Sequence, residues 1–436
     1  MAAAAIALAP KRLFASGRAP VGGQLSLHLP WPTGTIDPHR IDDATSAILG
    51  SALFEPLYAL TEAGATIPAL AETDPEPTRV GLRVPLRAGL RTAHDRPIDA
   101  RDVVASIGRA RSLGARGWLA DVPPPRAEGR GALVFATHDA EKLVRALSSP
   151  LVAIVPAGFS PERPDGTGPF RAERRGDALV LARSTLAAEG PACLDEVVVH
   201  PSADLAAPLR AFEGGEDTLG WLGSGLHEPR PGAKPFDFGA VAWAVLRTGR
   251  EAGAWDAPGI AQRMADGIAY ARVAYLVLGP PWSAQSEQGW GGPACDLLAR
   301  DDAPWLVELA KAVAATIGRP GHEVTARPAP AAEIAQRRAS RAFSLLLDVA
   351  RPLAPTPMGM FVGLATADDA STVADIATHA PRLDGASART LTRTMRIGVV
   401  GEVRVQGARV PDVTLAPAPA GGLNLGDATR ARRTTP

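Results

Sequence analysis

The residue types that carry out catalysis are present in this chain, but their spacing matches no catalytic motif. There is no Gly-x-Ser-x-Gly turn, no Gly-x-x-x-x-Gly-Lys loop to cradle a phosphate, and no Gly-x-Gly-x-x-Gly after an expected strand. Acid pairs such as Asp42-Asp43, Asp301-Asp302 and Asp368-Asp369 fall at expected helix starts or loops, where solvated capping explains them. We therefore expect a protein that is not an enzyme.

Residues that could hold a metal are dispersed in the same way. None of the eight histidines lies two or four residues from another, so the sequence predicts no preformed metal site. The only two cysteines, Cys193 and Cys295, exclude a disulfide-dense scaffold and a four-cysteine zinc site. They either pair with each other or remain two separate buried thiols, the default state of such cysteines. No cofactor is expected.

Two charged residues near the end of the chain's second half are candidates for binding a ligand. Asp348 and Arg351 follow the apolar run 343–347, which we expect to be a strand, and precede a proline-rich loop. A carboxylate can bind an ammonium group, and a guanidinium group can bind a carboxylate. The competing interpretation of Asp348 is a turn or capping residue after the strand.

Aromatic faces for a ligand are available from three of the eight tryptophans. Trp31, Trp221 and Trp243 are expected at strand ends or loops, and each either lines a binding cleft or packs in a core. Trp305 lies in an expected amphipathic helix and is assigned to the core.

The segment from Val84 to Ala110 shows most clearly which local elements the chain forms. A short strand runs into the turn 94–97, where Pro97 lacks the backbone donor that a sheet needs. A helix then begins, with Asp99 as its N-cap and Asp102 in its first turn, and it is expected to stop at Gly114. The segment is therefore a strand, a turn and a capped helix.

The rest of the chain alternates in the manner of mixed α/β lobes. Hydrophobic periodicity and helix-start signals predict strands at 133–137, 179–182, 197–200 and 343–347, and helices from Asp139 and at 203–212, 260–277, 304–317 and 333–341. No repeat at a solenoid or propeller period is present.

The 84–110 string resembles the block "LR.GV.FHDG.P.TA.DV..S..R" of family 5 extracytoplasmic solute-binding proteins, the peptide and nickel receptors of ABC importers. Three further blocks resemble the same family, in the same order: Thr35–His39 ("TLDPH"), Phe54–Tyr58 with Ile67–Glu72 ("YEPL…PALAE"), and Gly166–Phe170 with 179–182, 194–199 and 215–217 ("GTGPY…LERN…LDEIVFR…GEID"). The resemblance covers roughly Gly22 to Gly223.

The second half departs from the family pattern. Pro258–Arg272 resembles the family helix "D..VR.A...AIDR", whereas the late "W..DYPDP" loop has only a degraded counterpart in 347–355. The ligand class is therefore open among an oligopeptide, a similar small solute, and nickel or another metal chelate.

The resemblance implies a periplasmic-binding-protein-like fold, with two main mixed α/β lobes around a ligand cleft and an accessory lobe. Residues 236 and 397 would bound the third lobe, so the hinge is expected at the two points, near 235 and 397, where the chain passes between lobes one and three. The implied bounds are 22–50, 166–235 and 398–436 for lobe one, 51–165 for the accessory lobe two, and 236–397 for lobe three.

The function implied by the resemblance is capture of a peptide or small molecule by closure of the lobes and delivery to an ABC permease in the membrane. Asp348 would then bind the ammonium group of a peptide and Arg351 its carboxylate, while Trp31, Trp221 and Trp243 would line the cleft. A sensory or regulatory protein that uses the same cleft is the alternative. A monomer in a periplasmic or other extracytoplasmic location is expected.

Length and charge agree with these expectations. The 436 residues exceed a single core, so several lobes are expected, and 46 basic residues balance 46 acidic ones, which argues against nucleic acid as a partner. Residues 1–21 are either a signal remnant or a disordered tail, because the apolar run Ala2–Ala9 lacks a preceding basic region. No other apolar run approaches the ~20 residues that span a membrane.

Overall fold

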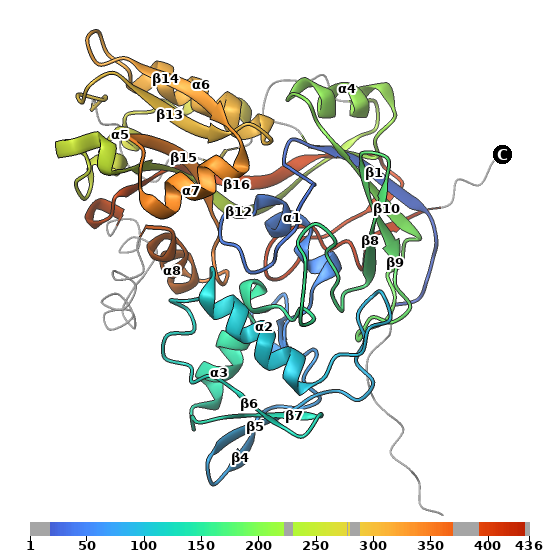
Figure 1. Cartoon of the computed structure of the whole chain (residues 1–436). Coiled ribbons are helices and arrows are strands. Elements are labelled where there is room, and N and C mark those ends of the chain that lie inside the picture. Colours follow the sequence, from blue (N-terminus) through green and yellow to red (C-terminus); the bar gives the residue numbers. More distant parts are fainter. Residues whose placement is uncertain (1–17, 222–229, 277, 280–287, 369–391, 432–436) are drawn as a thin grey trace, which may run out of the picture.

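The computed structural model describes residues 18–221, 230–276, 278–279, 288–368 and 392–431. The N-terminal run Ala2–Ala9 lies outside these residues, as do His227 and His379. Within them, the chain forms three main sheets with helices packed around them (Figure 1).

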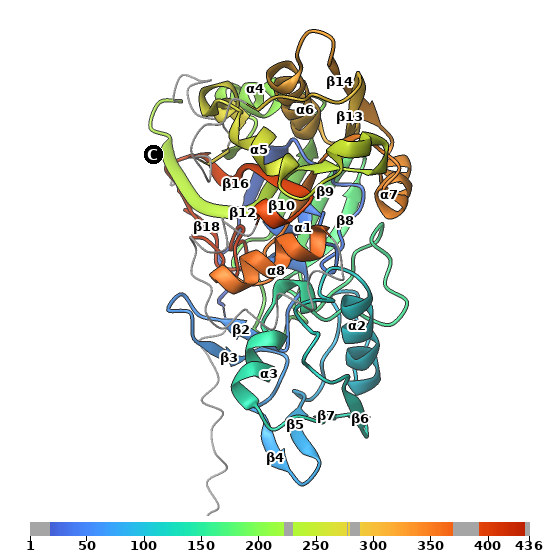
Figure 2. The ribbon, with the colours of Figure 1, turned by 90° about the vertical axis from the view of Figure 1, so that its left-hand side faces the viewer.

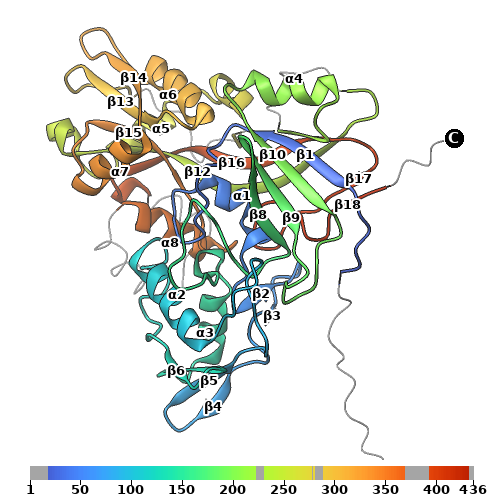
Figure 3. The same ribbon diagram turned by 45° about the vertical axis from the view of Figure 1, so that its right-hand side comes forward.

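The first of these, called here the β1 sheet, has four strands in the order β1-β10-β9-β8. β1 alternates between buried and more exposed side chains, as expected for a strand with one face on a core. It pairs in parallel with β10, and the other pairs are antiparallel. Figure 3 shows this sheet facing the viewer, with α4 (Ala206–Gly214) above it. Its strands are β1 (Gln24–Leu29), β8 (Phe170–Arg175), β9 (Ala178–Arg183) and β10 (Glu196–Pro201).

The second, the β12 sheet, has six strands in the order β11-β16-β12-β15-β13-β14. Its two longest strands, β12 and β16, pair antiparallel and run across the middle of the molecule (Figure 1). They begin at Lys234 and Ile397, next to the two expected chain crossings. The strands are β11 (Leu219–Trp221), β12 (Lys234–Thr248), β13 (Cys295–Arg300), β14 (Val324–Ala329), β15 (Leu345–Ala350) and β16 (Ile397–Arg409).

Helices cover both faces of the β12 sheet because alternate strand residues point to opposite sides. Leu345 and Leu347 of β15 share a core with α6, whereas Leu346 shares one with Ile334 of α7. The helices are α5 (Ile260–Asp266), α6 (Pro304–Ile317), α7 (Ala331–Ser340) and α8 (Pro357–Asp368). Short 3-10 turns complete this part: η2 (Arg250–Trp255), η3 (Tyr270–Arg272), η4 (Ala274–Leu276) and η6 (Thr392–Thr394).

The third sheet, the β5 sheet, lies with α2 and α3 at the bottom of the molecule (Figure 2). α2 has a complete capping box, in which Asp99 accepts from the helix backbone and Asp102 accepts from the Asp99 N–H. The strand order is β4-β5-β7-β6. The elements are β4 (Glu76–Thr78), β5 (Gly81–Pro85), β6 (Arg126–Glu128), β7 (Ala132–Phe135), α2 (Ala100–Ser112), α3 (Ala140–Leu147) and η1 (Pro150–Val152).

One helix and two small hairpins connect these sheets. α1 (Ala44–Leu53) lies between the β1 sheet and the β12 sheet (Figure 3). The hairpins pair β2 (Tyr58–Leu60) with β3 (Thr66–Pro68) and β17 (Val413–Thr414) with β18 (Thr429–Arg430). Among the described residues, no helix is both long and apolar enough to cross a membrane.

The mixed α/β class predicted from the sequence is confirmed, and one predicted helix is wrong in length. The expected helix over 260–277 ends at Asp266, where Gly267 caps α5, and short 3-10 turns follow. Glycine is a poor helix residue, and here it outweighs the apolar spacing that continues beyond it. The lobe bounds stay a prediction. The strand β11 and nearly all of β16 fall in predicted lobe one, yet both pair within the β12 sheet, whose other strands fall almost entirely in predicted lobe three.

Candidate functional site

A cavity of about 250 Å³ lies where segments of the three predicted lobes meet. One wall is α1, whose Ala47, Gly50 and Ser51 line the space. The other walls come from segments far apart in the sequence: the β2–β3 hairpin, residues 148–153, Val241 of β12, residues 351–352 and the loop 418–421. A small molecule in this space would therefore contact segments of all three predicted lobes at once.

α1 is held in position by its N-cap. Asp43 accepts a hydrogen bond from the Ser46 N–H at 2.8 Å and another from the Asp37 N–H at 2.7 Å. Burial raises the pKa of Asp43 to about 6. The apolar side of the helix, including Ile48 and Leu49, is fully buried and leaves the small residues on its other side to face the cavity.

The loop 418–421 is fixed against α1 by backbone contacts. The Leu423 N–H donates to the Ile48 carbonyl at 3.0 Å, and the Ser51 hydroxyl donates to the Leu423 carbonyl at 2.9 Å. Gly422 has a φ of 87°, and a Cβ at this position would lie 2.5 Å from the Ala47 carbonyl oxygen. Only glycine fits such a close approach without strain.

Arg351, predicted from the sequence as a ligand-binding residue, lines this cavity. Its backbone N–H donates to the Ile41 carbonyl at 2.9 Å, and its Nη1 lies 3.5 Å from the Pro38 carbonyl and 3.4 Å from the Arg40 carbonyl. Burial lowers the pKa of Arg351 to about 10, although nearby aspartates such as Asp43 raise it. The group is therefore a buried cation, and its role toward a ligand stays a prediction.

Asp348, the other predicted charged residue, does not line the cavity and pairs with two arginines. Its carboxylate lies 2.8 Å from Arg338 Nε and 3.3 Å from Arg247 Nη1. Arg338, on α7, also reaches Asp42 at 2.5 Å, and Arg40 holds Asp42 from the other side at 2.8 Å. This chain of buried charges, the Asp42–Arg338–Asp348 network, joins the loop before α1 to the β12 sheet. The role of Asp348 in binding an ammonium group stays a prediction.

A second polar cluster supports the same loop from the side of α2. His39 is fully buried; its Nε2–H donates to the Ala153 carbonyl at 2.8 Å, and its Nδ1 accepts from Arg109 at 2.9 Å. Arg109 also pairs with Asp37 at 2.6 Å. Burial lowers the pKa of His39 to about 4, so the ring is neutral at pH 7.

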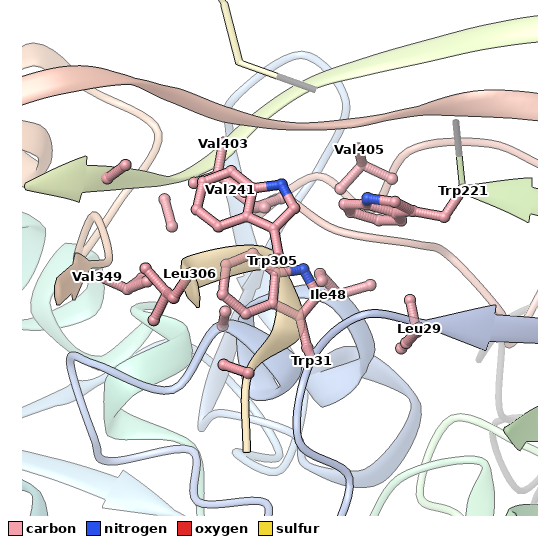
Figure 4. Close-up of a cluster of buried hydrophobic side chains, with 14 of the residues drawn as sticks. Leu29, Trp31, Ile48, Trp221, Val241, Trp305, Leu306, Val349, Val403 and Val405 are labelled. Atoms are coloured by element: carbon pink, nitrogen blue, oxygen red, sulfur yellow. The ribbon is translucent and has the colours of Figure 1, made fainter. Parts of the chain in front are cut away.

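Two of the predicted tryptophans, Trp31 and Trp221, lie in a buried cluster rather than in the cavity (Figure 4). The ring of Trp31, after β1, lies 4.7 Å from the ring of Trp305 at the start of α6. Ile48 of α1 lies beside these rings in the same cluster (Figure 4). The Nε1 atoms of Trp31 and Trp221 are buried and have no hydrogen-bond partner among the residues described. Trp305 is in the core as predicted, and the cleft-lining role of Trp31 and Trp221 stays a prediction.

Trp243, the third predicted tryptophan, lies in the interior of β12, so its expected place at a strand end or loop is wrong. Its ring is buried in a different core cluster, which includes Phe361 of α8 and Ile397 of β16. The error arises because β12 is a strand of 15 residues whose second half is continuously buried, so no alternation marks its ends.

Glu55, which follows α1, lines the cavity and was not proposed as a site residue from the sequence. It stands in the Phe54–Tyr58 motif that carried the family resemblance. It is 7% exposed, and burial raises its pKa to about 8. An acid inside an otherwise apolar motif is the only sequence signal that points to it.

The described residues contain no group of three or more histidine, cysteine, aspartate or glutamate side chains arranged to hold a metal ion. Cys193 and Cys295 are both free and partly buried, so the two separate thiols expected by default are what the structure has.

No protein-family model matches the chain, and no curated protein matches it. Solved structures do resemble it. The oligopeptide-binding protein AppA from Bacillus subtilis, in complex with a nonapeptide, has a TM-score of 0.73 at 14% identity over 95% of this chain and 100% of that one. The murein tripeptide binding protein MppA of Escherichia coli has a TM-score of 0.73 at 14% identity, over 94% of this chain and 99% of that one.

NikA from Staphylococcus aureus, in complex with Ni(L-His)2, has a TM-score of 0.69 at 16% identity, over 94% of this chain and 100% of that one. At these identities the likeness concerns the fold. The chain therefore has the periplasmic-binding-protein-like fold of extracytoplasmic solute-binding proteins, as the sequence motifs predicted.

Proposed function

We propose that this chain is the solute-binding protein of an ABC importer. It captures an oligopeptide or similar small solute by closure of its lobes and delivers the solute to a membrane permease from an extracytoplasmic location. The fold neighbours are binding proteins for peptides and for a nickel complex, and the solute leaves this chain chemically unchanged.

The observation that carries the proposal is the cavity lined by segments of all three predicted lobes. A ligand that touches both main lobes only when they are closed shifts the equilibrium toward the closed form by its difference in affinity for the two forms. The side chains of α1 that line the cavity are small and so leave room for a solute. Arg351 supplies a buried cation for a carboxylate group of the solute.

The volume of the cavity limits the size of the solute. At about 250 Å³ it is larger than the ~150 Å³ apolar cavity that accepts a benzene molecule, and smaller than the ~300–1,000 Å³ typical of drug-sized ligands. A space of this volume suits a solute of one or two amino-acid residues better than a long peptide.

Native mass spectrometry tests the proposal. The protein is mixed with a pool of amino acids, dipeptides and tripeptides, together with the small-molecule fraction of a cell extract from its own host. We expect the wild-type chain to retain a species, and Ala47→Trp, which fills the cavity from α1, to retain none.

Ala105→Trp is the matched control, because Ala105 is exposed on α2 and does not line the cavity. It should retain the same species as the wild type. Equal retention by all three proteins would contradict the proposed location of the solute, and no retention by the wild type would contradict the proposed function.

A further inference from the structure

The edges of the β1 sheet and the β12 sheet are joined by a small set of hydrogen bonds. β1 is the edge strand of the first sheet, and β11 is the edge strand of the second. The Thr218 N–H donates to the Ser26 carbonyl at 3.0 Å, and the Ser26 N–H donates to the Thr218 hydroxyl at 2.9 Å. The His28 N–H donates to the Asp217 carboxylate at 2.8 Å. These bonds hold β1 against the turn that leads into β11.

One of these contacts is also a buried ion pair. The Asp217 oxygen that accepts from the His28 N–H, Oδ2, lies 2.7 Å from His28 Nδ1. The side chain of Asp217 is 1% exposed and that of His28 is 20% exposed. The other oxygen of Asp217 is buried without a hydrogen-bond partner, and the carboxylate forms no second ion pair among the described residues. A protonated His28 ring therefore supplies the charge that pairs with Asp217.

A second histidine fixes the orientation of the His28 ring. β1 and β10 lie side by side in Figure 3, and His28 is paired with His200 in their parallel register. The two rings stack, with their centroids 4.8 Å apart and their planes at 21°. They lie on the face of the sheet opposite to the core residues Leu25, Leu27 and Leu29. Solvent can therefore exchange a proton with His28, whereas Asp217 is covered.

The acidic groups around the His28 ring favour its protonated form. The hydrogen bond to Asp217 raises the pKa of His28 above 6.5, although burial opposes the rise. The charges of Asp217, of Glu216 in the same turn, and of Asp177 between β8 and β9 act in the same direction as the hydrogen bond. Glu196 of β10 lies at the other end of the strand pair.

The basic groups near the joint do not replace His28. Arg230 donates to the Asp217 backbone carbonyl at 3.2 Å. α4 also packs against β1, but its Arg210 pairs with an acid just before that helix, and its Glu213 is exposed. When His28 loses its proton, the neutral ring can still donate from Nδ1, but the Asp217 carboxylate is left buried without a paired cation.

We propose that the His28–Asp217 pair is a pH-sensitive joint between the β1 sheet and the β12 sheet, firm while the His28 ring is protonated and loosened when the ring gives its proton to solvent. A histidine suits this role because its charge changes near neutral pH. α1 contacts both sheets and lines the cavity, so the joint also helps to fix one wall of the cavity.

Hydrogen exchange of backbone amides, followed by NMR on the full chain, tests the joint. The Ser26 and Thr218 amides donate across it, so their protection, corrected for the intrinsic effect of pH on exchange, measures its opening. A titration of the imidazole resonances reads the charge of His28 in the same samples. In the wild type we expect the protection of both amides to fall roughly fivefold or more as His28 loses its proton, because charge-assisted hydrogen bonds are about twice as strong as neutral ones.

The direction of the effect follows from the raised pKa of His28. The ion pair is complete below pH 6.5 and is lost as the pH rises through the higher pKa of the folded chain. Protection should therefore be highest on the acid side of the titration and lowest on the alkaline side.

Two variants remove the charge from either partner. His28→Gln keeps a hydrogen-bond donor without a titratable charge, and Asp217→Asn removes the buried charge. We expect the protection of both amides to be independent of pH in each variant, and His28 of Asp217→Asn to lose its proton at a lower pH than in the wild type. His94→Gln is the matched control, because His94 forms a partly exposed pair with Asp165, at 3.0 Å, outside the joint. It should keep the wild-type pH dependence.

Wild-type protection that does not change with pH, or that rises with pH, would overturn the proposal. The same pH dependence in His28→Gln as in the wild type would overturn it too, as would an unchanged titration of His28 in Asp217→Asn. If a variant fails to fold, the wild-type curves still decide, since the loss of protection must follow the titration of His28.

Discussion

The Asp42–Arg338–Asp348 network predicts a large effect for one substitution on α7. In Arg338→Met, the carboxylates of Asp42 and Asp348, 7% and 4% exposed, each lose one of two arginine partners. Burial alone would raise the pKa of Asp42, but Arg338 and Arg40 outweigh it and hold that pKa well below its ordinary value. The network therefore keeps the buried Asp42 carboxylate ionised.

The magnitude follows from what remains after the substitution. Removing one partner of a buried ion pair costs about 3–5 kcal/mol, because the other charge is left buried and unpaired. Here Arg40 still lies 2.8 Å from Asp42 and Arg247 lies 3.3 Å from Asp348. We therefore expect the lower end, about 3 kcal/mol in the free energy of unfolding.

Urea denaturation of four proteins measures this effect. They are the wild type, Arg338→Met, Asp42→Asn and the double variant, whose comparison isolates the coupling between the two side chains; we expect about 1–2 kcal/mol of coupling. Arg337→Met is the matched control on the same helix, because Arg337 is 36% exposed and pairs with the surface acid Glu333. Its cost should stay below about 1 kcal/mol.

A cost of Arg338→Met no larger than that of Arg337→Met, or zero coupling to Asp42, would show that the network does not stabilise the fold. The network links the loop before α1 to α7 and β15, so its loss should also favour separation of these parts. An increased radius of gyration of Arg338→Met without ligand would be the corresponding change in X-ray scattering.

Three further substitutions have expected outcomes that urea denaturation at fixed pH can measure. Folding lowers the pKa of His39 from 6.5 to about 4, so between these pH values the unfolded chain binds a proton that the folded chain does not. The free energy of unfolding should therefore fall by up to about 3 kcal/mol as the pH drops through this range. His39→Gln should reduce this pH dependence, and an unchanged dependence would contradict the assignment to His39. Folding raises the pKa of Glu55 from 4.5 to about 8, so between these pH values the folded chain holds a proton that the unfolded chain has lost. The free energy of unfolding should therefore fall by at most about 5 kcal/mol as the pH rises through this range. Glu55→Gln should remove this pH dependence, and its persistence would place the cause in another residue. Gly422→Ala should cost about 1–3 kcal/mol because its φ is 87° and the new Cβ would meet the Ala47 carbonyl, whereas Gly129→Ala, with a φ of 61° and open space, should cost less.

Local sequence signals predicted the helices and strands that are determined by residues close to one another in the sequence. The Asp99 cap, the helix over 304–317 and the strand near 197–200 are found as expected, because capping and apolar spacing act within a few residues. α5 is shorter than predicted because Gly267 interrupts its pattern. Fold class also followed from the sequence, through four motifs in order.

The site could be predicted only in part, since it depends on contacts between distant segments. Arg351, which follows β15, lines the cavity, and its role toward a ligand stays a prediction. Arg338 and Asp42 are 296 residues apart, and neither has a local pattern that marks it. Trp243 was misplaced because a continuously buried strand has no alternation to show its ends. Glu55 was visible in a motif, but only the folded chain shows that its carboxyl group lines a cavity.

Small-angle X-ray scattering measures whether the lobes close on a solute held in the cavity between them. The measurement uses the wild-type chain before and after saturation with the species that native mass spectrometry finds bound. We expect a smaller radius of gyration with the solute and no change for Ala47→Trp, whose cavity is filled. Superimposable profiles of the wild type, with binding verified in the same sample, would contradict it.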